Sequence, residues 1–139
     1  MSYEFTNKLR VRYGETDQMG FVYYGVYAQY YEVGRVEALR DLGILYSEIE
    51  TKHKIWMPVM NMQVRYLRPA TYDDLLTIVT TIPELPERHI RFRYEIFNEK
   101  GELLNNALVQ LCFLESTTKK RIDAPEFIQR PLKSYFQFL

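Results

Sequence analysis

The chain has 139 residues, a length at which a single domain buries enough apolar surface to fold without disulfides or a structural metal. It carries 18 basic and 18 acidic residues, and this zero formal charge argues against nucleic acid or an anionic membrane as an electrostatic partner. One cysteine excludes an intramolecular disulfide and favours a reducing compartment. The polar first ten residues lack a signal-peptide core, and no apolar run is long enough to cross a membrane. We therefore expect one cytoplasmic domain, residues 1–139, with no membrane insertion.

The first predicted element is a half-buried strand over residues 5 to 13, where polarity alternates along the chain. Its inward residues are expected to be Phe5, Leu9, Val11 and Tyr13. Residues 13 to 25 follow with three glycines and no sustained period. Long loops inside small domains tend to be functional, so this segment is the first candidate for a site.

Apolar residues at helical spacing then predict a helix from about Gly25 to Leu42, with a possible short second helix over residues 46 to 52. Gly34 would destabilise a helix by about 1 kcal/mol relative to alanine, which predicts a close backbone approach there. Gly43 is a plausible C-terminal cap. Two adjacent apolar stripes predict a helix nearly engulfed by other structure: Val26, Tyr30 and Val33, and Tyr27, Tyr31, Gly34 and Ala38.

After Pro58 the apolar residues recur at every second position, which predicts four more strands separated by turn-forming sequences. These strands are centred on residues 60–66, 76–82, 90–96 and 107–113 and are expected to form an antiparallel meander. The order of one strand, one long helix and four strands predicts an α+β fold, with an antiparallel sheet wrapped around one long central helix.

Several common sites are missing from the sequence, which has no GxSxG, GxxxxGK[ST] or GxGxxG motif. Cys112 falls in the last alternating strand, where a buried inert thiol is expected. His53 and His89 are 36 residues apart and are expected to serve at the surface or as caps. Two histidines and one cysteine cannot form an all-His/Cys zinc site.

Asp17 is the carboxylate in the loop that leads into the predicted helix. A helix N-terminus offers unpaired N–H groups that can hold an oxyanion, and a carboxylate nearby can attack a carbonyl or activate water. From chemistry alone, the more common role for an aspartate in a glycine-containing loop is a turn or capping residue whose side chain bonds the local backbone. Asp73 and Asp74 are expected to be solvated turn residues.

Two glutamates of the predicted helix compete with Asp17 for a catalytic role. Glu32 has buried-looking neighbours, and a buried carboxyl with a raised pKa would suit general base chemistry. However, Glu32 with Arg35 and Glu37 with Arg40 are spaced as ion pairs, which a structural role explains.

Three segments resemble the hotdog-fold acyl-CoA thioesterases of the 4-hydroxybenzoyl-CoA thioesterase type. They are YGETDQMGFVYYGVY at 13–27, QYYEVGRVEALRDLG at 29–43 and YLRPATYDD at 66–74. The similarity extends from about residue 7 to residue 125. It implies a hotdog fold and hydrolysis of an acyl-CoA thioester to the free acid and coenzyme A.

The resemblance also implies roles for individual residues. Asp17 would be the catalytic carboxylate, the backbone N–H of Tyr24 would polarise the thioester carbonyl with support from Gly25, and Tyr13 would help to shape the site. Tyr23 belongs to a cluster of six of the 12 tyrosines, within residues 13 to 31, that is expected to form the wall of the site.

Coenzyme A enters as part of the substrate, and the resemblance implies no metal and no separate cofactor. It also implies homodimers that join their sheets, often paired into tetramers, with active sites at subunit interfaces. Arg88, Arg91 and Lys119, with Lys120 and Arg121, are candidates for contacts with the phosphates of coenzyme A.

Two positions depart from the family pattern: Tyr24 stands where many members have histidine, and Met19 replaces a smaller residue. Hydratases of this fold use an aspartate and a histidine five residues later, and Val22 at that position excludes this activity. Two alternatives to acyl-CoA hydrolysis stay open. One is a non-catalytic acyl or aromatic ligand-binding protein, and the other is an acyl-carrier-protein thioesterase whose basic residues face the carrier.

Overall fold

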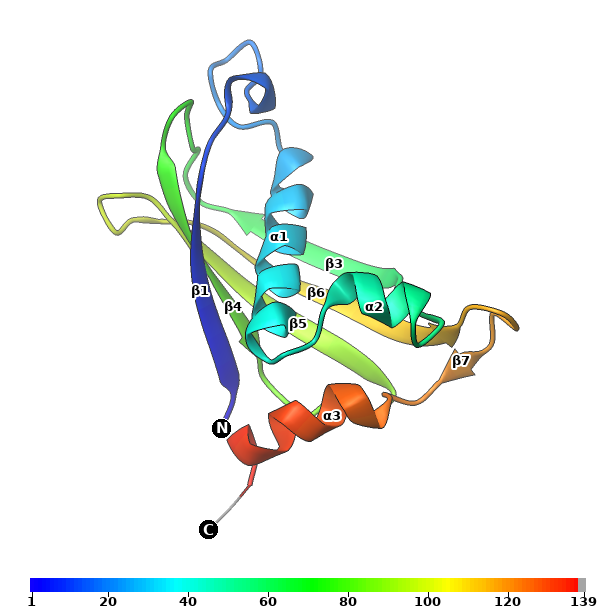
Figure 1. Cartoon of the computed structure of the whole chain (residues 1–139). Coiled ribbons are helices and arrows are strands. Elements are labelled where there is room, and N and C mark those ends of the chain that lie inside the picture. Colours follow the sequence, from blue (N-terminus) through cyan, green and yellow to red (C-terminus); the bar gives the residue numbers. More distant parts are fainter. Residues whose placement is uncertain (138–139) are drawn as a thin grey trace.

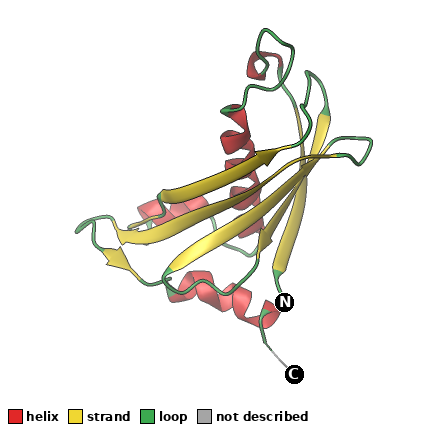
Figure 2. Ribbon diagram, turned by 180° about the vertical axis from the view of Figure 1, so that it is seen from behind, coloured by secondary structure: helices red, strands yellow, loops and turns green. Residues whose placement is uncertain are grey.

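The long helix α1 (Val26–Asp41) lies across one face of a curved antiparallel sheet in the computed structural model, which describes residues 1–137 (Figure 1). Figure 2 shows the other face of this sheet, with the helices behind it. The predicted α+β architecture, a sheet wrapped around one long helix, is therefore confirmed. The main strands are β1 (Tyr3–Arg10), β3 (Val59–Tyr66), β4 (Leu75–Ile82), β5 (His89–Phe97) and β6 (Leu103–Glu115). Shorter elements are β2 (Ile55–Trp56), β7 (Arg121–Ile122), α2 (Tyr46–Thr51), α3 (Glu126–Leu132) and 3₁₀ turns at Tyr13–Glu15 and Lys133–Tyr135.

The order of the strands corrects the predicted four-strand meander. Strands β4, β5 and β6 do form a meander, but β3 pairs with the far side of β6, and β4 pairs with β1 instead. The segment 67–74 between β3 and β4 is too long for a tight hairpin, and it crosses the end of the sheet. The N–H groups of Leu67 and Arg68 both donate to Leu104 O at 2.9 Å, which ties the start of this crossing to β6. The resulting order is β1-β4-β5-β6-β3.

Burial along α1 confirms one predicted stripe and corrects the other. Tyr27, Tyr31, Gly34 and Ala38 are buried as expected. Val33, by contrast, is 41% exposed, and Arg35 is buried in its place. The buried face of the helix is therefore rotated relative to the face that hydrophobicity alone predicts.

Gly34 sits where α1 approaches the sheet most closely. A Cβ atom at this position would lie 2.5 Å from Thr80 Oγ1, and 3.2 Å from carbons of Ile78 and Tyr94. Such contacts leave no room for a methyl group, so the predicted close approach is confirmed.

The end of α1 and the cysteine also agree with expectation. Gly43 has φ +83° and donates to Arg40 O at 2.9 Å, as a C-terminal cap does. His53 stacks on Phe127 with ring centroids 3.8 Å apart and so joins α2 to α3. Cys112 is a buried free thiol in β6. Among the described residues, no helix is long and apolar enough to span a membrane.

Replacing Gly34 with alanine is expected to destabilise the fold, although alanine is the better helix former. The added methyl group overpacks the contact with Thr80, which typically costs about 1–3 kcal/mol and exceeds the gain in helix propensity. Urea unfolding at a fixed protein concentration measures the change. Gly14→Ala is the matched control, because a Cβ atom there meets nothing within 4 Å. Equal unfolding free energies for the two variants would contradict the close-approach explanation.

Candidate active site

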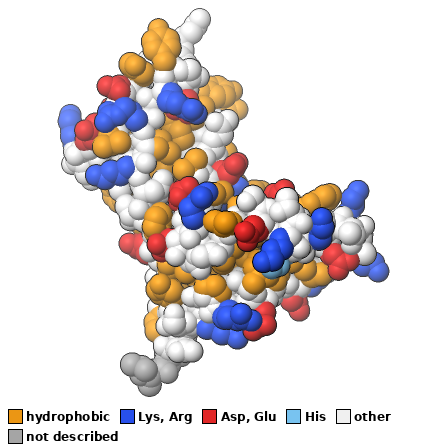
Figure 3. Space-filling model, in the orientation of Figure 1, with side chains coloured by type: hydrophobic (Ala, Val, Ile, Leu, Met, Phe, Trp, Pro, Cys, Tyr) orange, Lys and Arg blue, Asp and Glu red, His pale blue; other side chains and the backbone are white. Residues whose placement is uncertain are grey.

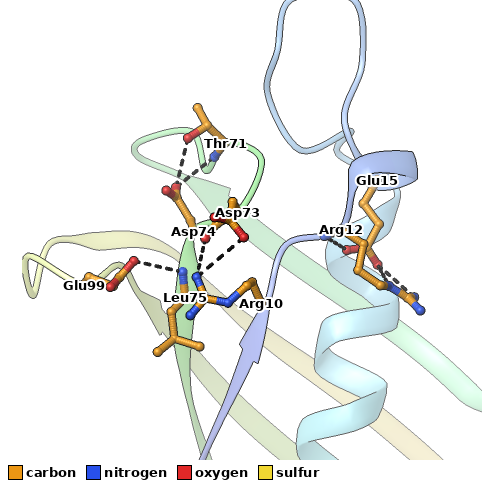
Figure 4. A network of polar contacts seen from close by, with 8 residues as sticks. All are labelled: Arg10, Arg12, Glu15, Thr71, Asp73, Asp74, Leu75 and Glu99. Carbon is orange, nitrogen blue, oxygen red and sulfur yellow. Dashed lines mark hydrogen bonds and ion pairs between the residues drawn. The ribbon is translucent and has the colours of Figure 1, made fainter.

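The loop from Tyr13 to Gly25 is fixed against α1 by the carboxylate of Glu15. This buried carboxylate accepts a hydrogen bond from the backbone N–H of Arg12 at 2.8 Å, and the Arg12 guanidinium lies 3.1 Å away (Figure 4). It also accepts a hydrogen bond from the Tyr30 hydroxyl at 2.9 Å. The chain consequently leaves β1 in a 3₁₀ turn. Tyr13, predicted to face inward, is 81% exposed and packs edge-on against Tyr72. It does not line the pocket described below.

Asp17 holds a tight turn with one carboxylate oxygen. Its Oδ1 accepts bonds from the N–H groups of Met19 at 2.9 Å and Phe21 at 3.3 Å, while its own N–H donates to Phe21 O at 2.8 Å. Gly20 has φ +83°, which allows this turn. Within residues 1–137, Oδ2 makes no hydrogen bond to the protein. The predicted turn role is therefore correct, and it leaves one oxygen of Asp17 available for chemistry.

Two backbone amides are left free where α1 begins. The N–H groups before and after them are used: Tyr23 donates to Glu15 O at 3.0 Å, and Val26 donates to Tyr23 O at 2.9 Å. In the described part of the chain, the N–H groups of Tyr24 and Gly25 have no acceptor. Gly25 is the N-cap, so both amides lie at the positive end of the helix. They can serve as donors to a developing oxyanion.

Asp17 and the start of α1 open onto one cavity of about 370 Å³, between the loop and the end of β3. Its walls are mostly apolar and aromatic, and Figure 3 shows hydrophobic side chains exposed beside charged ones at this end of the molecule. The lining residues are Asp17, Met19, Phe21, Val22, Tyr23, Tyr24, Tyr27, Tyr66, Leu67, Arg68 and Pro69. The structure thus brings together Asp17, Tyr23 and Tyr24, whereas Gly25, the N-cap that follows Tyr24, is not among the lining residues.

Three phenols of this cavity, those of Tyr23, Tyr27 and Tyr66, have raised pKa values and are neutral at physiological pH. The neighbouring Tyr24 phenol raises the pKa of Tyr23, and the charge of Asp17 adds to this effect. Burial raises the pKa of Tyr27 and Tyr66. The cavity therefore offers apolar ring surface and neutral hydroxyl groups beside the carboxylate of Asp17.

The basic residues predicted to contact the phosphates of coenzyme A lie away from the cavity of their own chain. Arg88 pairs with Asp123 at 3.1 Å and Arg91 pairs with Glu84 at 3.2 Å, both near the beginning of β5. Lys119 Nζ lies 6.0 Å from the ring centroid of Trp56. Figure 1 shows the start of β5 and the region around β7 at the opposite end of the molecule from the 13–25 loop.

Arg68 is the cation that does line the cavity, and it was not among the residues selected from the sequence. It follows β3 and pairs with Glu102 at 3.4 Å. The only feature of the sequence that could have pointed to Arg68 as a site residue was its place in the YLRPATYDD segment.

The other carboxylates have structural roles or lie outside the cavity. Glu37 pairs with Arg40 at 3.5 Å, as predicted. Glu32 is exposed and forms no ion pair with Arg35 within the described chain, so that second predicted pair is wrong.

Asp73 and Asp74 shape the turn before β4, as predicted (Figure 4). Asp74 Oδ2 accepts bonds from Thr71 N at 2.9 Å and from the Thr71 hydroxyl at 3.2 Å. Asp73 has φ +71° and lies beside Arg10.

Comparison with known proteins decides the family. The family model described as Thioesterase superfamily matches residues 19–105. The chain belongs to the thioesterase superfamily. The resemblance to hotdog-fold thioesterases found in the sequence is thereby confirmed, and the matched segment contains the start of α1 and the crossing from β3 to β4.

Individual superfamily members resemble the chain over much or nearly all of its length. The YneP protein of Bacillus subtilis is 38% identical over 69% of this chain and 69% of its own. The acyl-CoA thioester hydrolase YbgC of Escherichia coli is 31% identical over 90% of this chain and 92% of its own. The structure of a DHNA-CoA thioesterase from Staphylococcus aureus superposes with a TM-score of 0.86 at 29% identity, covering 98% of this chain and 97% of that one.

Glu15→Gln is expected to flatten the dependence of stability on pH. Burial raises the pKa of Glu15, but hydrogen bonds from Arg12 and Tyr30 outweigh this and lower it below its usual value. The stabilisation is therefore present above the pKa of an unfolded glutamate and is lost as pH falls through the lower, folded value. Urea unfolding of wild type from neutral to acid pH should show this loss, and the variant should not. Glu50→Gln, which removes an exposed carboxylate, is the control, and a wild-type slope in Glu15→Gln would contradict the assignment.

Proposed function

We propose that the protein hydrolyses acyl-CoA thioesters to the free acid and coenzyme A, at the cavity beside the start of α1. The observation that carries this proposal is that Asp17, which has one free carboxylate oxygen, and Tyr24, whose backbone amide is free, line the same cavity. Superfamily membership supports a thioester substrate. The names of the Escherichia coli and Staphylococcus aureus relatives both specify a coenzyme A thioester.

The chemistry begins with the thioester carbonyl oxygen accepting a hydrogen bond from the Tyr24 amide, with Gly25 as a second donor. Negative charge develops on this oxygen as the carbonyl carbon becomes tetrahedral, so donors already in place lower the barrier. Because the donors are backbone groups, tyrosine in place of histidine at position 24 does not remove them.

Asp17 can act in two ways. As a nucleophile, its free oxygen attacks the carbonyl carbon, the C–S bond breaks and coenzyme A leaves as the thiolate, after which water hydrolyses the mixed anhydride. As a general base, it takes a proton from water and the resulting hydroxide attacks the carbonyl carbon; the C–S bond then breaks, and the proton passes to the leaving thiolate. Both routes give the same products and need the ionised carboxylate.

Asp17→Asn is expected to lower kcat for release of the coenzyme A thiol by about 10²–10⁴-fold, the usual contribution of a positioned acid–base group. Asparagine keeps an oxygen that can accept the bonds from Met19 and Phe21, so the turn should survive. Thiol release is followed with a colorimetric reagent across short, long and aromatic acyl-CoAs. Glu32→Gln, which neutralises an exposed carboxylate on α1, is the control and should retain activity.

Two results would count against this proposal. Turnover by Asp17→Asn within a few-fold of wild type would remove Asp17 from the mechanism. Saturable binding of acyl-CoAs by wild type without thiol release would instead identify a ligand-binding protein.

The active unit in this proposal is a homodimer that pairs the β3 edges of two subunits. In the described chain β3 pairs only with β6, and its outer edge is open. Met62 is 45% exposed and Tyr66 is 50% exposed on this strand, and an open apolar edge favours pairing with another chain. Joining the edges around a twofold axis extends the sheet across both subunits.

Antiparallel pairing of two β3 strands also completes the cavity. It places the beginning of one β3 beside the end of the other, where Tyr66 lines the cavity. The partner's Trp56, which precedes β3, and the partner's Lys119 beside its ring would then reach the cavity mouth. In this arrangement the partner's Lys119 could contact coenzyme A from across the interface.

Met62→Lys is expected to convert the dimer to a monomer and to abolish most thiol release. The substitution places two ammonium groups near the twofold axis in a strand edge that must be desolvated, and like charges opposed across strands are unfavourable. Sedimentation velocity at micromolar concentration gives the oligomeric state. Val33→Lys introduces the same charge at an exposed position on α1 and should leave the β3 dimer intact. A stable wild-type monomer that is fully active would contradict the shared site.

A further inference from the structure

Trp56, the only tryptophan of the chain, is 41% exposed beside the hairpin that joins β6 to β7. This hairpin lies away from the 13–25 loop (Figure 1). Trp56 pairs with Leu114 of β6, and Leu114 pairs with Arg121 of β7. Residues directly opposite one another in antiparallel strands share a face, so an indole, an aliphatic side chain and a guanidinium group lie in a row. Tryptophan is enriched at binding surfaces because its ring supplies a large contact area.

The cations next to this ring have no carboxylate partner. Lys119 Nζ lies over the indole, 6.0 Å from the ring centroid. Arg121 Nε is buried and makes no hydrogen bond within the described residues. In residues 1–137 neither Lys119 nor Arg121 lies within ion-pair distance of a carboxylate. The carboxylate of Glu115, in the same hairpin, accepts from the Thr117 hydroxyl at 3.1 Å instead. Both cations can therefore receive an anion from outside the chain.

Two lysines near Trp56 adopt a backbone conformation that is rare for their residue type. Lys54 has φ +57° and Lys119 has φ +60°, in the left-handed region that favours glycine. Their two turns touch, because Ser116 N donates to Lys54 O at 2.8 Å. Backbone strain of this kind gathers at active sites and ligand-binding surfaces, where it sets the position of a side chain. The strained pair is a second, independent indication of a binding surface beside Trp56.

The chemistry of this surface fits the nucleotide end of coenzyme A. An exposed indole binds a purine by stacking, and ammonium and guanidinium groups bind phosphates. Coenzyme A has an adenine ring, a 3′-phosphate and a 5′-diphosphate at one end, so it offers both kinds of contact. An acidic carrier protein offers carboxylates to the cations but no purine to Trp56. The zero formal charge of the chain argues against a long polyanion and favours a local anionic ligand.

The proposed β3 dimer brings this surface to the active site of the other subunit. Trp56 and Val59 pair with Leu114 and Leu111 of the same strand, so the chain stays extended between them. Antiparallel pairing about the middle of β3 sets Val59 of the partner subunit opposite Tyr66, which lines the active-site cavity. Trp56 of the partner subunit then lies three residues further on, about 10 Å beyond Tyr66. The pantetheine arm of coenzyme A is long enough to span this gap.

We propose that Trp56, Lys119 and Arg121 of one subunit bind the adenosine phosphate end of a coenzyme A whose thioester is hydrolysed at the other subunit. Adenine stacks on the indole and displaces Lys119 Nζ from the ring face, and Lys119 and Arg121 bind the phosphates. This inference rests on the proposed hydrolysis and the proposed dimer, and it specifies coenzyme A as the carrier of the acyl group. Because Trp56 is the only tryptophan, its fluorescence reports directly on occupancy.

Fluorescence titration of the wild-type protein tests this site without requiring turnover. Coenzyme A should quench Trp56 saturably, 3′-dephospho-coenzyme A should bind more weakly, and pantetheine should leave the emission unchanged. Lys119→Met should weaken coenzyme A binding by a few-fold, the scale of an exposed ion pair. Lys100→Met, which removes an exposed lysine between β5 and β6, is the control and should bind as wild type does. Emission that coenzyme A leaves unchanged, or that pantetheine changes equally, would overturn the inference.

Kinetics compare one acyl group carried by coenzyme A, by pantetheine and by a carrier protein. Trp56→Leu should lower kcat/KM for the acyl-CoA on the order of 10-fold, mainly through KM, as the loss of base stacking usually does. It should leave kcat/KM for the acyl-pantetheine unchanged. Equal losses on both substrates would give Trp56 a role in the fold or the acyl pocket, and a loss confined to the carrier protein would identify a protein partner. Either result overturns the nucleotide site.

Mixed dimers test whether the ring comes from the partner subunit. When Asp17→Asn and Trp56→Leu subunits are combined, one active site contains both intact residues and the other contains neither. Supply of the ring by the partner predicts about half the wild-type kcat/KM for acyl-CoA. If Trp56 served its own subunit, both sites would be impaired. Activity no higher than that of the Trp56→Leu homodimer would therefore contradict the proposal.

Failure of the proposed hydrolysis can be told apart from failure of the nucleotide site. Quenching by coenzyme A without release of thiol from any acyl-CoA would support the nucleotide site and contradict the hydrolysis. Equal thiol release from acyl-CoA and acyl-pantetheine, with no quenching, would support the hydrolysis and contradict the nucleotide site.

Discussion

At Gly34 the backbone of α1 lies directly on the side chains of β4 and β5, with no side chain of its own between them. This contact sets both the height of the helix above the sheet and its rotation about its axis. With the rotation fixed, Tyr27 and Tyr31 turn toward β3 and β6, and Arg35 is carried into the interior. The start of the helix, where Tyr24 has a free amide, lines the same cavity as Tyr66. The positions of the site residues therefore follow from one close packing contact.

Hydrogen bonds order the loop before α1 and, among the described residues, leave free one oxygen of Asp17 and the amides of Tyr24 and Gly25, the groups to which we assign the chemistry. Glu15 joins the loop to Tyr30, Val22 donates to Ala70 O at 2.8 Å, and the turn at Asp17 uses a single carboxylate oxygen. The remaining oxygen and the two amides are held in place before any ligand binds. Groups that are already oriented need little reorganisation when charge develops, which is the main electrostatic advantage of an enzyme site over water.

Local signals predicted much of this structure from the sequence. The helix was expected from Gly25 to Leu42, and these residues are its N- and C-caps. This prediction was possible because the glycines, the apolar spacing and the cap at Gly43 all act over a few residues. The loop and Asp17 were selected for the same kind of reason. Long-range pairing was not predictable: a period of two identifies β3 as a strand but does not say that its neighbour is β6.

Side-chain partners were predicted less well than elements. Spacing alone paired Arg35 with Glu32, but the packing at Gly34 buries the arginine and leaves the glutamate in solvent. Tyr13 continued the alternation of β1 in the sequence, yet the chain had already turned at Arg12 to bond Glu15. The candidate phosphate contacts, Arg88 and Arg91, are engaged by Asp123 and Glu84 instead.

The most direct measurement is a crystal structure of the Asp17→Asn protein with an acyl-CoA bound. The account predicts that the thioester carbonyl oxygen lies within hydrogen-bond distance of Tyr24 N, with the side chain of residue 17 facing the carbonyl carbon. An acyl-CoA whose thioester lies away from the start of α1 would contradict it.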